Sequence, residues 1–411
     1  MFVKQIIPVQ LGRVSMKKLE HDKKNGIDAK PEGSGTDPLG SIAKSASAST
    51  QEHRQKRFLL LSKIRNIYLK EGTERALKHA TSYHRTSLCK HACTGSGGVE
   101  LHLLQKAKKA FYTGLQTCGS VWTCPICANK IQEVRRQEIA CAMNYFYELE
   151  QKHQAVMITF TFPHAKTDKL AELLKKFKVA LKSFKSGRPF IRFKKEFGYK
   201  GLIRSLEVTH GENGWHPHTH ELFFVLDDID EDKFASDVRG MWWNFCLSVG
   251  LVKDKPRKKK EFFAHAIDVK FKCSTSEYLA KQDDAKHWGV DREIARGVGK
   301  SENINKGKHP FKLADENNHE LFIEYTTAIK NTAQIYWTPG LKDLVGVNDI
   351  DDETAAELEG EDEVIDVGNI PKRLWHTVTK KELRANVLEL AEEEKDIVYI
   401  RSFIFAESKN E

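Results

Sequence analysis

The stretch from Glu207 to Val225 constrains the fold most, because it specifies two strands and the turn between them. Gly211 and Gly214 bracket a four-residue turn, and turn length sets the pairing register of a hairpin, here placing Glu207 opposite His218. Side chains of a strand alternate between faces. One face of the second strand therefore carries five residues of interest: His216, His218, His220, Leu222 and Phe224.

These residue types in this register predict a metal site. Directly opposed residues have Cβ atoms roughly 5 Å apart, so Glu207 can share one cation with His218 and His220. Imidazole and carboxylate groups suit divalent transition metals. His216 is a less certain additional contact. The alternative is a His-rich surface hairpin that binds nothing, but the apolar run 223–225 favours a strand anchored in a core.

A cysteine-rich region precedes the hairpin. The N-terminus lacks a signal-peptide pattern, so the eight cysteines are expected in a reducing cytosol, where clustered Cys indicates metal rather than disulfide. A C-x3-C and a C-x2-C pair predict a zinc site formed by Cys89, Cys93, Cys124 and Cys127, with Cys118 or His91 able to replace one of them. The alternative is a small core of reduced cysteines. The other three are interpreted as ordinary buried cysteines: Cys141, Cys246 and Cys273.

Charge indicates the kind of partner. The net charge of +9 is uneven, because Lys and Arg crowd residues 52–90, 169–200 and 252–272, whereas residues 349–366 are acidic. Such asymmetry favours a polyanion, most simply nucleic acid. No apolar run approaches about 18 residues, so no membrane span is expected.

The order of predicted elements indicates the fold class. A strand at 155–164, a Lys-rich helix at 168–186, the Glu207 hairpin and a helix at 231–250 predict an α+β split βαβ sandwich, with one antiparallel sheet backed by helices. Further predicted elements are helices at 51–84, 128–151, 274–286, 287–297 and 322–328, strands at 262–270, 334–342 and 397–405, and a helix before the last of these.

A metal beside a basic groove suggests chemistry on a phosphodiester. Tyr278 is the best candidate nucleophile, and Lys281 shares its face because residues three apart on a helix are neighbours. In isolation this Tyr-x-x-Lys pattern more often marks a packing tyrosine, and its position downstream of the His-x-His strand gives it weight. Tyr325 is the other tyrosine worth testing.

Together these motifs resemble the HUH endonucleases, specifically the rolling-circle replication initiator (Rep) proteins of small bacterial plasmids. The resemblance rests on the strand at 156–164, the metal motif at 207–225 and the nucleophile motif at 278–281. The Cys-rich run 118–127 and the stretches 324–325 and 336–342 extend it over about residues 85–345.

The resemblance implies nicking of plasmid origin DNA, presented as a single strand or cruciform. Tyr278 would become linked to the 5′-phosphate, and His218 and His220, with Glu207, would hold Mg²⁺ or Mn²⁺. It also implies a bacterial cytoplasmic protein with host helicase and polymerase as partners, and allows a dimer. The implied fold is a ferredoxin- or RRM-like HUH nuclease domain with a zinc-binding segment.

The implied domain organisation has five parts. They are a flexible leader (1–55), a basic helical and Cys-rich zinc-binding region (56–150), the HUH nuclease domain (151–345), an acidic mobile segment (346–368) and a C-terminal helix and strand (369–411).

Two departures from the family pattern stand out. Thr219 occupies the middle of His-x-His, where a bulky hydrophobe is usual. Some initiators carry a glutamate four residues before the tyrosine to activate water for the terminating cut, and Ser274 stands there instead. Glu277, a second protomer's tyrosine or another carboxylate could replace it.

Three other functions compete. A conjugative relaxase or a single-strand transposase would share the metal and tyrosine chemistry, but motif order and length favour the initiator. A zinc-stabilised DNA-binding regulator that does not cleave would fit the charge and the cysteines, but it leaves Glu207, His218 and His220 without a purpose.

Overall fold

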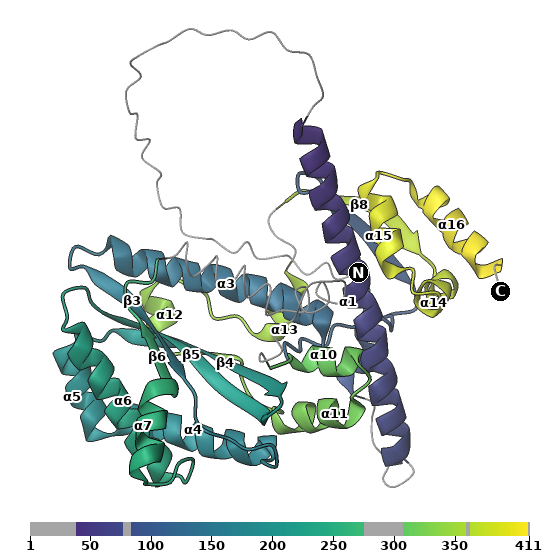
Figure 1. The fold of residues 1–411 in the computed structure, drawn as a ribbon. Helices are drawn as coiled ribbons and strands as arrows, with labels where there is room; N and C mark the ends of the chain where they lie inside the picture. The colour runs from purple at the N-terminus through teal and green to yellow at the C-terminus, as the bar shows by residue number, and fades with distance from the viewer. Residues whose placement is uncertain (1–37, 77–83, 275–306, 359–361, 410–411) are drawn as a thin grey trace, which may run out of the picture.

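The computed structural model describes residues 38–76, 84–274, 307–358 and 362–409, and for residues 38–50 and 72–76 only the backbone. Figure 1 shows two layered regions beside one long helix, α1 (Pro38–Ala76). Among the described helices, none combines the length and the apolarity needed to span a membrane.

The larger region is built on a five-stranded antiparallel sheet in the order β6-β3-β5-β4-β7. Its strands are β3 (His153–Phe160), β4 (Gly201–Gly211), β5 (Gly214–Leu226), β6 (Ile267–Lys270) and β7 (Ile335–Trp337). Helix α4 (Leu170–Ser186) lies between β3 and β4, and α6 (Glu231–Ser248) lies between β5 and β6. This β-α-β-β-α-β order with β3 and β5 central is the split βαβ arrangement, so the predicted fold class is confirmed.

Helices cover both faces of this sheet. Apolar side chains of α4 recur at helical spacing and pack on the face of β3 that carries Val156, Ile158 and Phe160, together with α6. Asp230 caps α6, because its side chain accepts a hydrogen bond from the Lys233 amide. On the other face, α3 (Pro125–Glu148) packs on Leu222 and Phe224 of β5. The end of β5 that carries the histidines lies outside this apolar contact with α3.

A second, three-stranded sheet has the order β2-β1-β8 and was not foreseen from the sequence. Its strands are β1 (Val99–Leu104), β2 (Lys109–Thr113) and β8 (Val364–Ile370). Helices α14 (Lys372–Lys380), α15 (Arg384–Glu392) and α16 (Ile397–Lys409) share its core. Phe58 of α1 joins this core, whereas Leu60, Leu61 and Ile64 join the core of the larger region. The long helix therefore connects the two regions, as Figure 1 shows.

The remaining helices among the described residues are short. They are α2 (Arg85–Leu88), α5 (Arg188–Glu196), α7 (Pro256–His265), α10 (Pro310–Asp315), α11 (His319–Ala328), α12 (Leu341–Leu344) and α13 (Asp352–Glu357).

The predicted strand at 397–405 is wrong, because these residues form α16. Its β-branched and aromatic residues favour a strand locally, but Ile400 and Ile404, four residues apart, are fully buried against the second core. Tertiary packing of one helical stripe outweighs the local preference.

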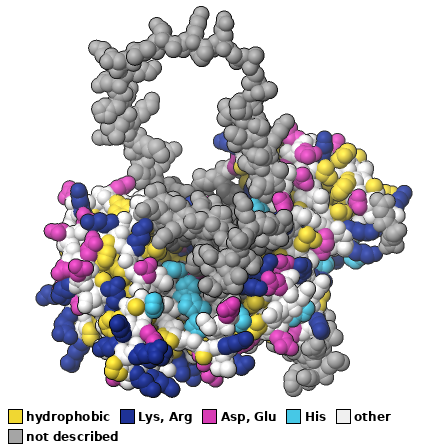
Figure 2. All heavy atoms as spheres, viewed as in Figure 1, with side chains coloured by type: hydrophobic (Ala, Val, Ile, Leu, Met, Phe, Trp, Pro, Cys, Tyr) yellow, Lys and Arg dark blue, Asp and Glu magenta, His cyan; other side chains and the backbone are white. Residues whose placement is uncertain are grey.

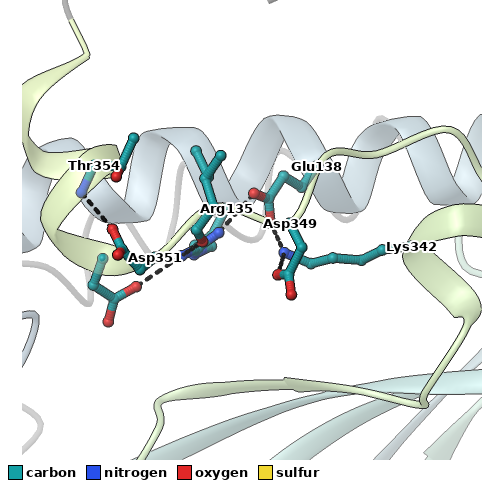
Figure 3. Close-up of polar contacts among 8 residues, drawn as sticks. Arg135, Glu138, Lys342, Asp349, Asp351 and Thr354 are labelled. Atoms are coloured by element: carbon teal, nitrogen blue, oxygen red, sulfur yellow. Dashed lines mark hydrogen bonds and ion pairs between the residues drawn. The ribbon is translucent and has the colours of Figure 1, made fainter.

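The acidic segment is ordered where the structure describes it, so the prediction of mobility is wrong for those residues. Asp351 caps α13, and Asp352 forms an ion pair with Arg135 of α3 at 2.8 Å. Lys342 reaches Asp349 at 3.0 Å and Glu138 of α3 at 3.5 Å, and Figure 3 shows this network spanning α3 and the acidic segment. Buried Ala355 and Ala356 complete the contact.

Three smaller predictions also need correction. Residues 262–265, expected in a strand, belong to helix α7, because Phe262 packs on Trp243 of α6 instead of entering the sheet. Residues 38–55 of the expected flexible leader are helical. Cys141, expected to be buried, is exposed on α3.

Candidate functional site

The β4–β5 hairpin has the register predicted from its turn. Gly211 pairs with Gly214 and Glu207 pairs with His218. Gly214 adopts φ +82°, a conformation that glycine tolerates readily, and a Cβ atom there would lie 2.9 Å from Lys166. The turn therefore fixes which side chains of the two strands meet.

Three ligand-type atoms meet on the hairpin. Glu207 Oε2 lies 3.1 Å from His218 Nε2 and 3.6 Å from His220 Nε2. The side chains of His218, Glu207 and His220 are 8, 22 and 27% exposed, so the cluster is half-buried but open to solvent on one side. Figure 2 shows histidine side chains gathered on this face of the molecule.

The hydrogen bonds behind the cluster orient both imidazoles. His218 Nδ1 lies 3.3 Å from the backbone oxygen of His216, which can only accept a hydrogen bond, so this nitrogen carries the proton. His220 Nδ1 lies 3.0 Å from Thr159 Oγ1. Both Nε2 atoms therefore face Glu207, the orientation that metal-binding histidines adopt when Nδ1 donates to a neighbouring acceptor. Thr159 of β3 lies directly opposite His220 of β5.

The donor set fits a divalent cation. In a neutral His218, the Nε2 lone pair points at a carboxylate, an arrangement that requires either a proton or a cation between them. Two ligands at about 2.1 Å from one ion and at a right angle are about 3 Å apart, close to the two observed separations. Three protein ligands leave coordination positions for a substrate oxygen.

The charge state of Glu207 is compatible with metal binding. Burial opposes its ionisation, but with protons in place of the cation, hydrogen bonds from His218 and His220 lower its pKa to about 2. The carboxylate is therefore ionised at neutral pH and available as a ligand.

His216, the less certain contact, lies outside the three-residue cluster. Its Nδ1 is 2.8 Å from His164 Nε2, and its Nε2 is 3.3 Å from Thr161 Oγ1. Burial, followed by the neighbouring His218 and His164, lowers its pKa to about 4. His216 thus links the hairpin to the loop that follows β3.

Sequence reasoning missed the roles of two histidines. His164 binds the hairpin turn, since its Nδ1 lies 2.9 Å from the backbone oxygen of Asn213. His309 caps α10, and burial lowers its pKa to about 4 although the charge of Glu207 acts in the opposite direction. The sequence did not indicate that His309 lies near Glu207, because no local motif marks it and it is far from the hairpin along the chain.

Thr219, the unusual middle residue, is fully buried on the opposite face of β5. Its hydroxyl has no hydrogen-bond partner among the described residues. Thr219 in place of a bulky hydrophobe therefore affects the packing behind the site, and it does not alter the face of β5 that carries the histidines.

A second cluster is formed by four buried cysteines, Cys89, Cys118, Cys124 and Cys127. The sequence predicts Cys93 as the fourth member, with Cys118 or His91 as alternatives; in the structure Cys93 pairs through its backbone with Leu115 and is only half-buried. The named alternative, Cys118, takes its place.

The four sulfurs have the geometry of a closed tetrahedral site. Cys127 Sγ lies 3.6 Å from Cys89 Sγ and 3.7 Å from Cys118 Sγ, and Cys124 Sγ lies 3.6 Å from Cys89 Sγ. Ligands of a tetrahedral zinc ion with 2.3 Å bonds are about 3.8 Å apart. Hydrogen bonds from the other three thiols hold the pKa of Cys127 far below its ordinary value. The cluster can therefore hold a metal ion such as zinc.

The predicted nucleophile motif, Tyr278, Lys281 and Glu277, lies outside the described residues. Ser274, before it, is described and half-buried. Tyr325 is fully buried beside Trp122 and Trp215, and burial raises its pKa, so it is a core residue.

A family model described as a replication protein matches residues 111–383 of this chain. A protein named Protein rep, from Streptomyces lividans, is 25% identical over 350 residues, which cover 68% of this chain and 76% of that protein. A neomycin resistance protein from Streptomyces cyanogenus is 31% identical over 146 residues, which cover 29% of this chain and 32% of that protein. No solved structure matches the chain. The range matched by the family model contains the Glu207–His218–His220 cluster and three of the four clustered cysteines.

Proposed function

This chain belongs to the replication protein family, and from that premise we propose that it initiates rolling-circle replication of a plasmid by nicking one strand of the origin DNA. The proposed activity is that of a metal-dependent, site-specific endonuclease and strand transferase. The observation that carries the proposal is the convergence of Glu207, His218 and His220 on a half-open face of the sheet.

The three side chains would hold Mg²⁺ or Mn²⁺, which supplies Lewis acidity toward a phosphate oxygen of the scissile bond. The protein contributes the orientation of these ligands. Thr159 and the His216 carbonyl fix the two imidazole rings, and the low pKa of Glu207 keeps its carboxylate charged. A pre-oriented ligand set needs no rearrangement when DNA binds.

Tyr278 is the proposed nucleophile. Its phenolic oxygen would bond to phosphorus, the bond from phosphorus to the 3′-oxygen would break, and that oxygen would take a proton. The products are a 5′-phosphotyrosine and a free 3′-hydroxyl that can prime synthesis. Storing the bond energy in the phosphotyrosine allows a later strand transfer.

Support for Tyr278 comes from the described residues that flank it. Cys273 donates a hydrogen bond from its amide to Ala155 of β3 and packs in the same cluster as Phe224. Phe224 and His220 are four residues apart, about 13 Å along a strand. In the predicted helix, the five residues from Cys273 to Tyr278 would advance only about 7.5 Å, and the length of the tyrosine side chain would supply the rest of the reach to the metal ligands.

Lys281 is proposed to stabilise the phenolate or the charge that develops on the phosphate. Glu277 is proposed for the terminating cleavage, because Ser274 replaces the glutamate that some initiators use there. Host helicase and polymerase are the partners that would extend the nicked strand, and the protein is proposed to act in the bacterial cytoplasm, alone or as a dimer.

The test is denaturing electrophoresis of the protein with a single-stranded origin library labelled at the 5′ or 3′ end, in Mn²⁺ or EDTA. The wild type should give a Mn²⁺-dependent protein band that carries only the 3′-labelled fragment. Tyr278→Phe and His218→Ala should both abolish it, whereas Tyr325→Phe, a substitution in the core, should retain it.

Cleavage without a covalent protein–DNA species would point to a hydrolytic nuclease and exclude Tyr278 as nucleophile. No cleavage with any metal, despite tight binding to an origin-containing library, would favour the non-cleaving DNA-binding regulator.

A further inference from the structure

A basic surface lies at the β6 edge of the large sheet. It comprises six residues, here called the α7 basic patch: Lys253, Lys255, Arg257, Lys258, Lys259 and Lys260. All six are exposed, and the Arg257 side chain is 89% exposed. Asp254 and Glu261 are the acidic residues within residues 253–261, so the patch is strongly positive.

The structure accounts for only part of this charge. Arg257 and Lys258 share one carboxylate, Glu261, at 3.0 and 2.9 Å. Lys259 lies over the rings of Trp243 and Phe263. Lys253, Lys255 and Lys260 form no ion pair with any described residue. Three exposed basic side chains without an ion pair to any described residue can therefore contact a ligand.

The patch also has an energetic cost. Helix α7 has no acidic residue in its first turn, where four consecutive basic residues lie near the positive end of the helix dipole, and Arg257 and Lys260, three residues apart, are neighbours of like charge. A bound polyanion would offset both repulsions, whereas solvent alone only screens them.

The patch is connected to the candidate metal site through the backbone. Ala266, directly after α7, accepts a hydrogen bond from the Thr161 amide, and the Thr161 hydroxyl lies 3.3 Å from His216. Strand β6, which follows, pairs with β3 beside Thr159. In the view shared by Figures 1 and 2, the gathered histidines and α7 lie on the same visible side of the molecule.

We propose that the α7 basic patch binds the phosphate backbone of the duplex DNA that adjoins the nick site, an inference that rests on the proposed nicking function. A duplex fits better than a single strand, because single-strand sites usually stack bases on exposed aromatic rings. Trp243 is buried, and none of the strongly exposed apolar side chains of the described residues lies within 253–272. The patch offers charge without a stacking platform.

The length of α7 sets the expected size of the contact. Its ten residues span about 15 Å. At about 3.4 Å per base pair, this length matches roughly four or five base pairs, so the patch can contact several successive phosphates. The patch would thus fix how the duplex enters the site.

The test compares two triple variants with equal loss of charge. The first is Lys253→Gln, Lys255→Gln and Lys260→Gln. The control is Lys175→Gln, Lys176→Gln and Lys182→Gln, three exposed lysines of α4 that form no ion pair with described residues. Binding is measured by fluorescence anisotropy in EDTA, at several salt concentrations, on a duplex of about 20 base pairs with a single-stranded tail and on the unpaired strand. Nicking of single-stranded DNA is measured separately in Mn²⁺.

The patch variant should bind the tailed duplex on the order of tenfold to a hundredfold more weakly, and its salt slope should fall by about 2.7, the value for three lost phosphate contacts. The control should change duplex affinity less than about twofold, and both variants should nick single strands like the wild type. Equal weakening by both variants, or equal weakening on the unpaired strand, would overturn the proposal. If the wild type nicks nothing, the proposed function fails, and the duplex measurement in EDTA still decides whether the patch binds DNA.

Discussion

The two ligand clusters of this molecule differ in closure. The cysteine cluster has four ligands, all buried, at separations that match a filled tetrahedron. The Glu207–His218–His220 cluster has three ligands, is open on one side, and lies on a strand end that α3 does not cover. A closed site stabilises a fold, whereas an open one keeps positions for a substrate.

The elements around the two clusters agree with a structural role for the closed one and a substrate-binding role for the open one. Cys89 follows α2 and Cys124 caps α3, so the closed cluster joins the ends of two helices beside α1. The open cluster stands on a hairpin whose backbone is held by its own ladder of paired residues. Loss of metal should therefore affect stability at one site and activity at the other.

The largest effect is expected from the closed cluster. Cys124→Ser should remove bound zinc and lower the unfolding free energy by more than about 4 kcal/mol, because losing a structural metal is among the most costly single changes. Zinc stoichiometry and thermal unfolding measure this, with exposed Cys141→Ser as the matched control. A Cys118→Ser protein that keeps its zinc while Cys93→Ser loses it would contradict the ligand set.

The open cluster should show the reverse pattern. His218→Ala with His220→Ala should reduce single-turnover nicking in Mn²⁺ about a thousandfold, since several kcal/mol of transition-state stabilisation are lost. The melting temperature of the metal-free protein should change little. His376→Ala, an exposed histidine of α14, is the control. A large loss of stability would show that both clusters are structural.

Removing the hydrogen bond that orients one histidine should have a smaller effect on nicking. Thr159→Val keeps the shape of the side chain but removes the hydroxyl beside His220 Nδ1. The Mn²⁺ concentration that gives half-maximal nicking should rise by about tenfold to a hundredfold. Thr161→Val, beside His216, should change it less, and equal effects of the two would argue against His220 as the supported ligand.

The smallest effect concerns the pH dependence of stability. The pKa of Glu207 is lowered to about 2, so its ionised form stabilises the folded state above its ordinary pKa, and that contribution disappears as the pH falls toward 2. In EDTA, the stability difference between wild type and Glu207→Gln should shrink from pH 6 to pH 3. Chemical denaturation at each pH measures it, with exposed Glu212→Gln as the control. A difference independent of pH would mean that the histidines do not stabilise the charged carboxylate.

Local sequence rules determined the hairpin and part of the cysteine cluster. Turn length and period-2 alternation act over a few residues, so they placed Glu207 opposite His218 before any tertiary contact was known. The Cys124–Cys127 spacing likewise defines one knuckle by itself, because Cys124 Sγ accepts a hydrogen bond from the Cys127 amide at the start of α3.

Long-range packing decided the rest. The exchange of Cys93 for Cys118 depends on the bridge between Cys93 and Leu115, which turns one cysteine away from the cluster. The pairing of β1 with β8 and the helical state of α16 depend on burial in a core assembled from both ends of the chain. Local propensities amount to less than about 1 kcal/mol per residue, so the burial of side chains such as Ile400 and Ile404 outweighs them. The sequence by itself determined the register that brings Glu207, His218 and His220 together and the split βαβ order, and the tertiary structure decided which cysteine completes the closed cluster and what surrounds the open one.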